Sequence, residues 1–251
     1  MLKLSGGAIA GDDGFGFNRE ALTHICDEVL SIADLGIQVC IVVGGGNIFR
    51  GNVAKDWNID RVEADNMGMM ATFINAVLLR AALKSKGGHE VRVMSALATE
   101  SIAEPFIRLR ALRHLKRGYI VVFAGGIGQP YVTTDYPAVQ RALQCECDAI
   151  LVAKQGVDGV YSADPNTDSD ARRYETLSYD DFVQKNLRVM DQSALLLARD
   201  HDIPVHIFNF DTTGTIRRIC LGENLGTSLS RDTRTVLAMA PSLDAEADTE
   251  A

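Results

Sequence analysis

The sequence predicts a three-layer α/β/α sandwich with a mainly parallel central sheet. The first reason is that short apolar runs recur and are apolar throughout, as in strands buried on both faces of a parallel sheet. These runs are residues 2–4, 37–43, 91–94, 119–123, 149–152 and 205–208. The second reason is that segments with helical spacing of apolar residues separate them, so strands and helices alternate.

Four helices are expected from their spacing and from their end signals. Asn18 can cap a helix that runs to about residue 35, and Ser178 can cap another whose first turn is acidic. Apolar residues at helical spacing predict a long helix from about 60 to 86. Residues 104–116 are expected to form a basic amphipathic helix.

The chain is expected to hold one domain and a tail. No internal repeat or linker interrupts residues 1–230, which we interpret as a single domain. Periodicity stops after about Ser230, so residues 231–251 are expected to be an acidic, disordered C-terminal tail.

Composition and charge exclude several classes of protein. The formal net charge of −8 argues against a general nucleic-acid binder. No run of about 18 uninterrupted apolar residues is present, and the N-terminus lacks the apolar segment of a signal peptide. We therefore expect a cytoplasmic protein that does not enter a membrane. The cysteines and histidines show no metal-binding spacing, and Cys145 and Cys147 are expected to be helix-end thiols.

Three glycine-rich segments follow predicted strands, at residues 5–7, 44–47 and 125–128. Glycine lets backbone amides face an anion, and a following helix N-terminus adds its dipole. Any one of them alone could be an ordinary turn, but the carboxyl ends of parallel strands share one edge of a sheet. Together they predict a single crevice for several phosphates. The signatures of P-loop NTPases, Rossmann dinucleotide sites and eukaryotic-type protein kinases are absent.

Four charged residues are the candidates for catalysis. Lys3 lies within an apolar strand, where an ammonium is costly unless it meets an anion at the strand end. Arg50 follows the second glycine segment closely enough to bind a phosphate bidentately. Asp135 and Asp191 begin helical runs, where each alone could be a helix cap. Phosphoryl transfer needs cations on the moving phosphate and carboxylates that orient them, and these four residues could supply both.

Seven segments carry a resemblance to a known family. They are KLSG at 3–6, GGGNIFRG at 44–51, ADNMGMMAT at 64–72, AEPFIRLRALRHL at 103–115, TTD at 133–135, VDGVYSADP at 157–165 and VMD at 189–191. In this order they resemble the bacterial uridylate kinases of the amino-acid-kinase fold family. MGMMAT and AEPFIRLRA are the most specific of these segments.

The resemblance implies transfer of the γ-phosphoryl group of ATP to UMP in pyrimidine biosynthesis, with Mg²⁺ carried by ATP. It implies ATP contacts from Lys3, Leu4, Ser5, Gly6, Gly46, Arg50, Gln155, Tyr161 and Asp164. It implies UMP contacts from Gly45, Asp65, Ile127, Gly128, Gln129, Pro130, Tyr131, Val132, Thr133 and Thr134. It also implies a homohexamer, with the 60–86 helix as a dimer surface, activation by GTP and inhibition by UTP.

The sequence departs from the family pattern at a few positions. Gly7 stands where a Glu is usual, and Ile127 replaces a Thr expected to hydrogen-bond UMP. Asn66 and the Tyr136-Pro137 pair are also unusual, and only two residues precede Lys3, fewer than in its relatives.

Two alternatives remain open at this stage. One is a small-molecule kinase of the same fold, of the acetylglutamate or carbamate type; the MGMMAT segment and Asp65 favour a nucleotide acceptor instead. The other is a nucleotide-binding relative without turnover, which the departures at Gly7 and Ile127 suggest and the four retained charged residues argue against.

Overall fold

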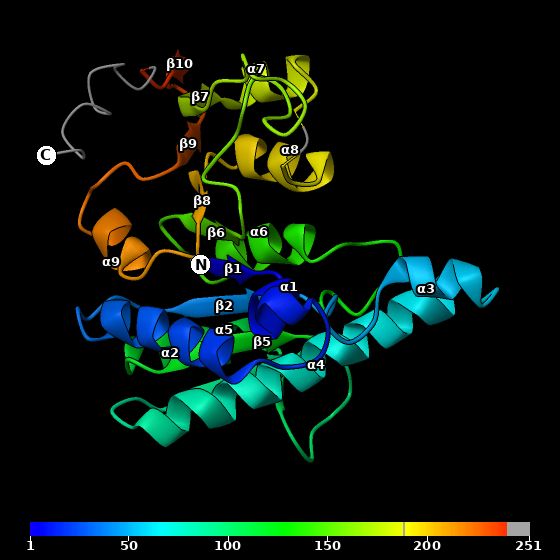
Figure 1. Cartoon of the computed structure of the whole chain (residues 1–251). Coiled ribbons are helices and arrows are strands. Elements are labelled where there is room, and N and C mark those ends of the chain that lie inside the picture. Colours follow the sequence, from blue (N-terminus) through cyan, green and yellow to red (C-terminus); the bar gives the residue numbers. More distant parts are fainter. Residues whose placement is uncertain (188, 240–251) are drawn as a thin grey trace, which may run out of the picture.

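The computed structural model describes residues 1–187 and 189–239, and within them the strands form one ten-stranded sheet (Figure 1). The strand order is β10-β7-β9-β8-β6-β1-β2-β5-β3-β4. The strands are β1 (Leu2–Leu4), β2 (Cys40–Val43), β3 (Val91–Ser95), β4 (Glu104–Pro105), β5 (Ile120–Ala124), β6 (Ile150–Lys154), β7 (Tyr174–Ser178), β8 (Val205–Asn209), β9 (Thr227–Ser230) and β10 (Val236–Leu237). From β8 across to β4 every pair is parallel, while β8–β9 and β10–β7 are antiparallel.

Helices cover both faces of this sheet. They are α1 (Gly7–Ala10), α2 (Arg19–Ala33), α3 (Gly51–Asp56), α4 (Arg61–Lys86), α5 (Arg108–Lys116), α6 (Asp135–Gln144), α7 (Tyr179–Gln184), α8 (Gln192–Asp200) and α9 (Thr215–Cys220), with a 3-10 turn η1 (Gly11–Asp13). The core on one face is built with α2, α4 and α9, and the core on the other face with α5, α6, α7 and α8. The three-layer α/β/α prediction is confirmed.

Strand β1 lies at the point in the sheet where the order of strand addition changes direction. It pairs with β2 on one side and with β6 on the other. The chain first adds β2, β3 and β5 on one side and only then crosses to β6. Leu2 and Leu4 belong to the core under α2 and α4, so Lys3 points to the opposite face. In parallel α/β sheets ligands bind at such a switch point.

Three of the expected helices begin with a side-chain cap. Asn18 accepts a hydrogen bond from the Ala21 amide at 3.0 Å, and Ser178 accepts one from the Asp181 amide at 3.1 Å. Asp60 caps α4 in the same way. These caps satisfy amides that have no partner within the first helical turn.

The helix expected over residues 104–116 begins later, at Arg108. Glu104 and Pro105 instead form the edge strand β4, which pairs with Met94 and Ser95 of β3. The prediction was wrong here because the residue before a proline is driven to extended backbone. The short strands β7, β9 and β10 were not expected either.

The chain also remains folded beyond residue 230, where the tail was expected to begin. Val236 pairs with Thr176 in the sheet, and the Thr235 hydroxyl hydrogen-bonds the Asp181 carboxylate. A short edge strand held by backbone pairing needs no apolar periodicity, which is why the sequence pattern missed it. The expected tail residues 240–251, with their acidic side chains, lie outside the described residues.

Helix α4 is long and apolar enough, by length and composition, to cross a membrane, with a mean hydropathy of 1.3 over its most apolar window. Its buried side chains, including Phe73, Ala76, Leu79 and Leu83, pack in the core beneath β2, β3 and β5. This packing is that of the core helix of a globular domain.

A buried carboxylate joins α2 to α9. Glu28 of α2 is only 2% exposed, and its carboxylate accepts from the amides of Gly214 and Ile216, the latter at 3.0 Å. The first turn of α9 has no side-chain cap of its own. The negative charge of Glu28 therefore satisfies two amides and complements the positive end of the helix dipole.

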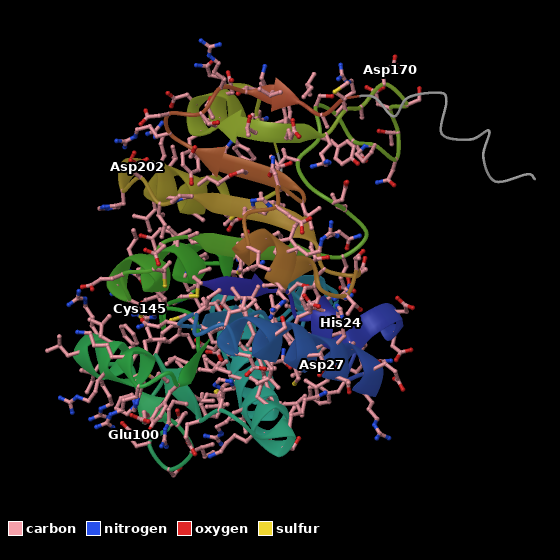
Figure 2. The ribbon with its side chains drawn as sticks, turned by 90° about the vertical axis from the view of Figure 1, so that its left-hand side faces the viewer. His24, Asp27, Glu100, Cys145, Asp170 and Asp202 are labelled. Atoms are coloured by element: carbon pink, nitrogen blue, oxygen red, sulfur yellow. The ribbon has the colours of Figure 1, made fainter. Side chains whose placement is uncertain are left out.

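We predict that Glu28→Ala lowers the free energy of unfolding by about 2–3 kcal/mol, because the buried Ile216 amide and the partly buried Gly214 amide lose a charged acceptor. Chemical denaturation followed by circular dichroism measures this difference. Asp170→Ala is the matched control, since Asp170 is exposed on a peripheral loop (Figure 2). Equal stability of the two variants would contradict the capping role.

Candidate active site

The three glycine-rich segments meet at one crevice. They follow β1, β2 and β5, which are adjacent in the sheet, so their loops leave the same edge side by side. The crevice has a volume of about 610 Å³. Of the expected contact residues, those that line it are Lys3, Ser5, Gly6, Gly45, Gly46, Arg50, Asp65, Ile127, Gln129, Val132, Thr133 and Thr134. Phe49, Met69, Thr72 and Pro137 also line it and were not expected.

Two glycines allow the loops to approach each other and α4. A Cβ on Gly6 would lie 2.5 Å from Asn47 Oδ1 and 2.6 Å from the Gly46 amide nitrogen. A Cβ on Gly45 would lie 2.7 Å from Ala71 Cβ in α4. Any side chain at either position would therefore push the loop away from its neighbour.

Polar side chains of α4 fix two of the loops. Asn75 donates to the Gly44 carbonyl at 2.7 Å and exchanges hydrogen bonds with the Asn47 side chain. Thr72 accepts from the Gly125 amide at 2.9 Å. Asn47 and Asn75 are fully buried, so their amides must be satisfied within the protein. Buried polar residues inside the MGMMATFINA helix were the sequence signal for this role, which sequence reasoning missed.

A buried ion pair forms the floor of the site. Lys3 Nζ lies 2.7 Å from Asp135 Oδ1, and the two residues are 7% and 9% exposed. The other oxygen of Asp135 accepts from the Asp191 amide at 3.1 Å. Burial by itself raises the pKa of Asp135, but the charges of Lys3 and Lys154 and the Asp191 amide outweigh it and lower that pKa.

Asp191 joins this cluster from α8. It occupies the N-cap position of that helix, but its carboxylate does not bond to the helix's own amides. Instead it accepts a hydrogen bond from the Thr133 hydroxyl, next to the start of α6. Lys3, Asp135 and Asp191, which are far apart in the sequence, are thus brought together.

Arg50 and Asp65 hold loops together at the rim of the crevice. The Arg50 guanidinium donates to the carbonyls of Gly46 and Gly14, both at 2.8 Å. Asp65 accepts from Arg61 at 2.9 Å and from the Tyr131 amide at 2.7 Å. Neither side chain is saturated, since a guanidinium has five donors and a carboxylate about four acceptor sites.

The remaining expected contact residues do not line the crevice. Leu4 is buried on the far face of the sheet, and Gly128, Pro130 and Tyr131 lie in the loop that borders the crevice.

Gln155 lines a neighbouring hollow of about 490 Å³ with Asn18, His24 and Asp211. The Tyr161 hydroxyl donates to Asp158, and Asp164 caps a turn at Asn166. A Cβ on Gly7 would lie 3.1 Å from Gln155 Oε1, so a side chain there would extend toward this hollow.

Sequence reasoning also missed Lys154. It ends β6, half-buried, and its Nζ donates to the Val189 carbonyl at 2.5 Å. Burial and the nearby Lys3 charge lower the pKa of Lys154, and the charges of Asp135 and Asp191 partly oppose this. The signal was similar to the one used for Lys3, a lysine next to buried apolar residues of a strand.

We predict that Asp135→Asn destabilises the fold at neutral pH by about 3–5 kcal/mol, because Lys3 is left buried without its counter-ion. The contribution of Asp135 is present above its ordinary pKa of 3.8 and is lost as pH falls through the lowered folded value. Urea unfolding of both proteins from pH 7 to pH 2 should therefore show a difference that shrinks below about pH 4. A constant difference would contradict the ion-pair account.

Comparisons with known proteins agree with this geometry. The model of the amino acid kinase family matches residues 1–209. The uridylate kinase of Frankia alni is 53% identical over 227 residues, covering 90% of this chain and 89% of the relative. That of Limosilactobacillus reuteri is 47% identical over 232 residues, covering 92% and 96%.

Two solved structures share the whole architecture. The UMP kinase from Bacillus anthracis superposes with a TM-score of 0.93 at 57% identity, covering 95% of this chain and 97% of the other. The UMP kinase from Ureaplasma parvum gives a TM-score of 0.87 at 34% identity, covering 92% and 97%. With these matches along nearly all of its length, the chain belongs to the amino acid kinase family and, within it, to the uridylate kinases.

Proposed function

We propose that the protein is a UMP kinase, which transfers the γ-phosphoryl group of ATP to UMP and yields ADP and UDP. The observation that carries this proposal is the crevice itself, where loops rich in glycine amides surround the buried Lys3–Asp135 pair at the switch point of the sheet. The strong similarity to uridylate kinases supports the choice of UMP as acceptor.

The acceptor is proposed to occupy the 610 Å³ crevice. Residues 127–134 would border its base and phosphate, and Gly45 offers a backbone surface with no side chain in the way. Asp65 has free acceptor capacity for ribose hydroxyls. Ile127 cannot donate a hydrogen bond, so recognition of UMP on that side would depend on the neighbouring backbone and on Gln129.

ATP is proposed to lie on the β6 side of Lys3. Ser5, Gly6 and Gly46 would face its phosphates, with Gln155, Tyr161 and Asp164 on the nucleoside side. Mg²⁺ is proposed to arrive bound to the ATP phosphates, where it would neutralise charge on the phosphate chain.

The reaction would be an in-line displacement. An oxygen of the UMP phosphate forms a bond to the γ-phosphorus while the bond from that phosphorus to the β-phosphate oxygen of ATP breaks. A phosphate monoester is largely dianionic at neutral pH, so no general base is required. Lys3 and Arg50 would stabilise charge on the transferred group, and Asp135 would hold Lys3 in position.

An ADP-release assay with UMP, CMP, dUMP, AMP, acetylglutamate and carbamate should show turnover with UMP well above that with the other acceptors. Equal turnover on all nucleotides would contradict the uridylate assignment. Preference for acetylglutamate or carbamate would establish the alternative kinase. ATP binding without any turnover would establish the non-catalytic relative.

We predict that Lys3→Met lowers kcat by about 100- to 1,000-fold, because a cation at the transferred phosphate is lost. KM for UMP should change far less than kcat, and steady-state kinetics measure both. Lys116→Met, which removes an exposed lysine of α5, is the control. An unchanged kcat in Lys3→Met would remove Lys3 from the site.

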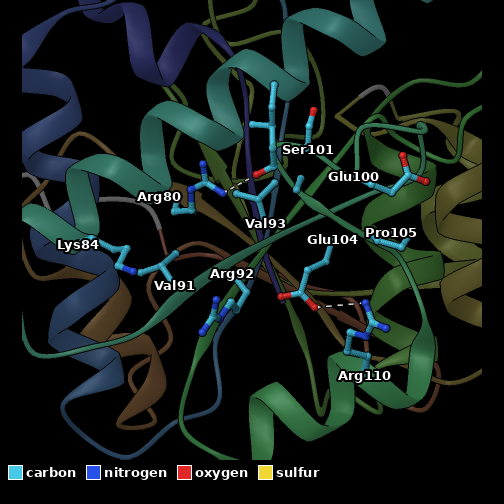
Figure 3. A pocket seen from close by; sticks show the side chains of 12 residues that line it. Arg80, Lys84, Val91, Arg92, Val93, Glu100, Ser101, Glu104, Pro105 and Arg110 are labelled. Atoms are coloured by element: carbon cyan, nitrogen blue, oxygen red, sulfur yellow. Dashed lines mark hydrogen bonds and ion pairs between the residues drawn. The ribbon is translucent and has the colours of Figure 1, made fainter.

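A homohexamer regulated by GTP and UTP, acting in the cytoplasm, is proposed from the same family membership. The exposed pair Met70 and Ile74 on α4 offers an apolar stripe for a contact between copies. A second hollow of about 410 Å³ gathers Arg80, Lys84, Arg92 and Arg110 against two carboxylates and could bind an anionic effector (Figure 3). Analytical ultracentrifugation tests the hexamer, and turnover with added GTP or UTP tests the regulation.

A further inference from the structure

We infer that Lys154 is a further catalytic cation, which contacts the phosphate chain of the donor nucleotide on the leaving-group side of Lys3. This inference rests on the proposed phosphoryl transfer. It assigns a role to a residue that lies outside the sequence motifs of the site.

The sheet register places Lys154 beside Lys3. Strands β1 and β6 are parallel neighbours, and Lys3 lies opposite Val152. Lys154 is two residues further along β6, so it is on the same face as Val152 and Lys3 and closer to the crevice edge. Lys3 in the middle of β1 and Lys154 at the end of β6 thus lie on neighbouring central strands at the switch point of the sheet.

The ammonium of Lys154 has unused donors. It can donate three hydrogen bonds. Among the described residues its one hydrogen bond goes to the neutral carbonyl of Val189, at 2.5 Å, and no carboxylate there forms an ion pair with it. An anion would stabilise this half-buried ammonium, because it would supply acceptors for the remaining N–H donors.

The nearby carboxylates are already engaged. Asp135 is paired with Lys3 and accepts from the Asp191 amide, and Asp191 accepts from Thr133. Burial and, after it, repulsion by the Lys3 charge lower the pKa of Lys154. A polyanion placed between the two lysines would relieve this repulsion. The triphosphate of the donor nucleotide is such a polyanion.

The side of the sheet decides which phosphate is contacted. Lys154 stands on β6, next to Gln155 and on the side of the proposed ATP contacts, whereas the proposed UMP crevice lies over β1, β2 and β5. When the bond between the γ-phosphorus and the β-phosphate oxygen breaks, its electron pair remains on ADP. A fixed cation on this side stabilises that developing charge, while no proton is transferred.

A structural role is the competing explanation, since the contact with Val189 could merely hold the segment before Asp191. Three variants separate the two. Lys154→Gln keeps an N–H donor for the Val189 carbonyl and loses the charge. Lys154→Arg keeps the charge, and Lys154→Met loses both. Lys116→Met again serves as the exposed-lysine control.

Each variant is assayed for kcat, for KM of ATP and of UMP, for melting temperature, and for binding of MgATPγS by titration calorimetry. We expect Lys154→Gln and Lys154→Met to lower kcat by about 100-fold or more and to weaken MgATPγS binding. The KM for UMP and the melting temperature should stay near wild-type values. Lys154→Arg should retain most of the kcat that the other two variants lose.

Wild-type kcat and MgATPγS binding in Lys154→Gln would overturn the inference, because the retained hydrogen bond would then be sufficient. Equal losses in UMP affinity and melting temperature in all three variants, including Lys154→Arg, would also overturn the inference. If the wild-type protein does not phosphorylate UMP, the proposed function fails separately, and MgATPγS affinity still decides whether Lys154 contacts the triphosphate.

Discussion

The site depends on burying one ammonium beneath it. Lys3 stands in the middle of the sheet, 7% exposed, and an isolated charge there would cost several kcal/mol. Asp135 offsets this cost from the first turn of α6, and the Asp191 amide holds Asp135 from the start of α8. The ion pair and this hydrogen bond therefore join β1 to both helices and fix the cation where the glycine loops converge.

The loops add positive potential without adding charged side chains. The acidic protein, with a formal net charge of −8, can bind anions because backbone amides and a few fixed cations set the local field. Helix α4 fixes these loops, because Asn75 donates to the Gly44 carbonyl and Thr72 accepts from the Gly125 amide. The close contacts at Gly6 and Gly45 leave no room for a side chain at either position.

Local signals predicted local structure well. Asn18 and Ser178 cap the helices that they were expected to cap, because a cap involves only residues a few positions apart. The helix start at residue 104 was wrong because the local effect of Pro105 on Glu104 was overlooked. The edge strand at Val236 was missed because its partner in β7 is distant in the sequence. Lys154 was missed because the role of a lysine at a strand end can be recognised only from its neighbours across the sheet.

By itself the sequence determined the alternation of strands and helices, the three glycine loops, and the presence of Lys3, Arg50, Asp135 and Asp191. These follow from periodicity, capping and residue chemistry, which act over short stretches of chain. Only the tertiary structure decided the strand order, and with it which charges meet. Pairing of Lys3 with Asp135, and the place of Lys154 beside them, depend on contacts between residues more than a hundred positions apart, which no local pattern encodes.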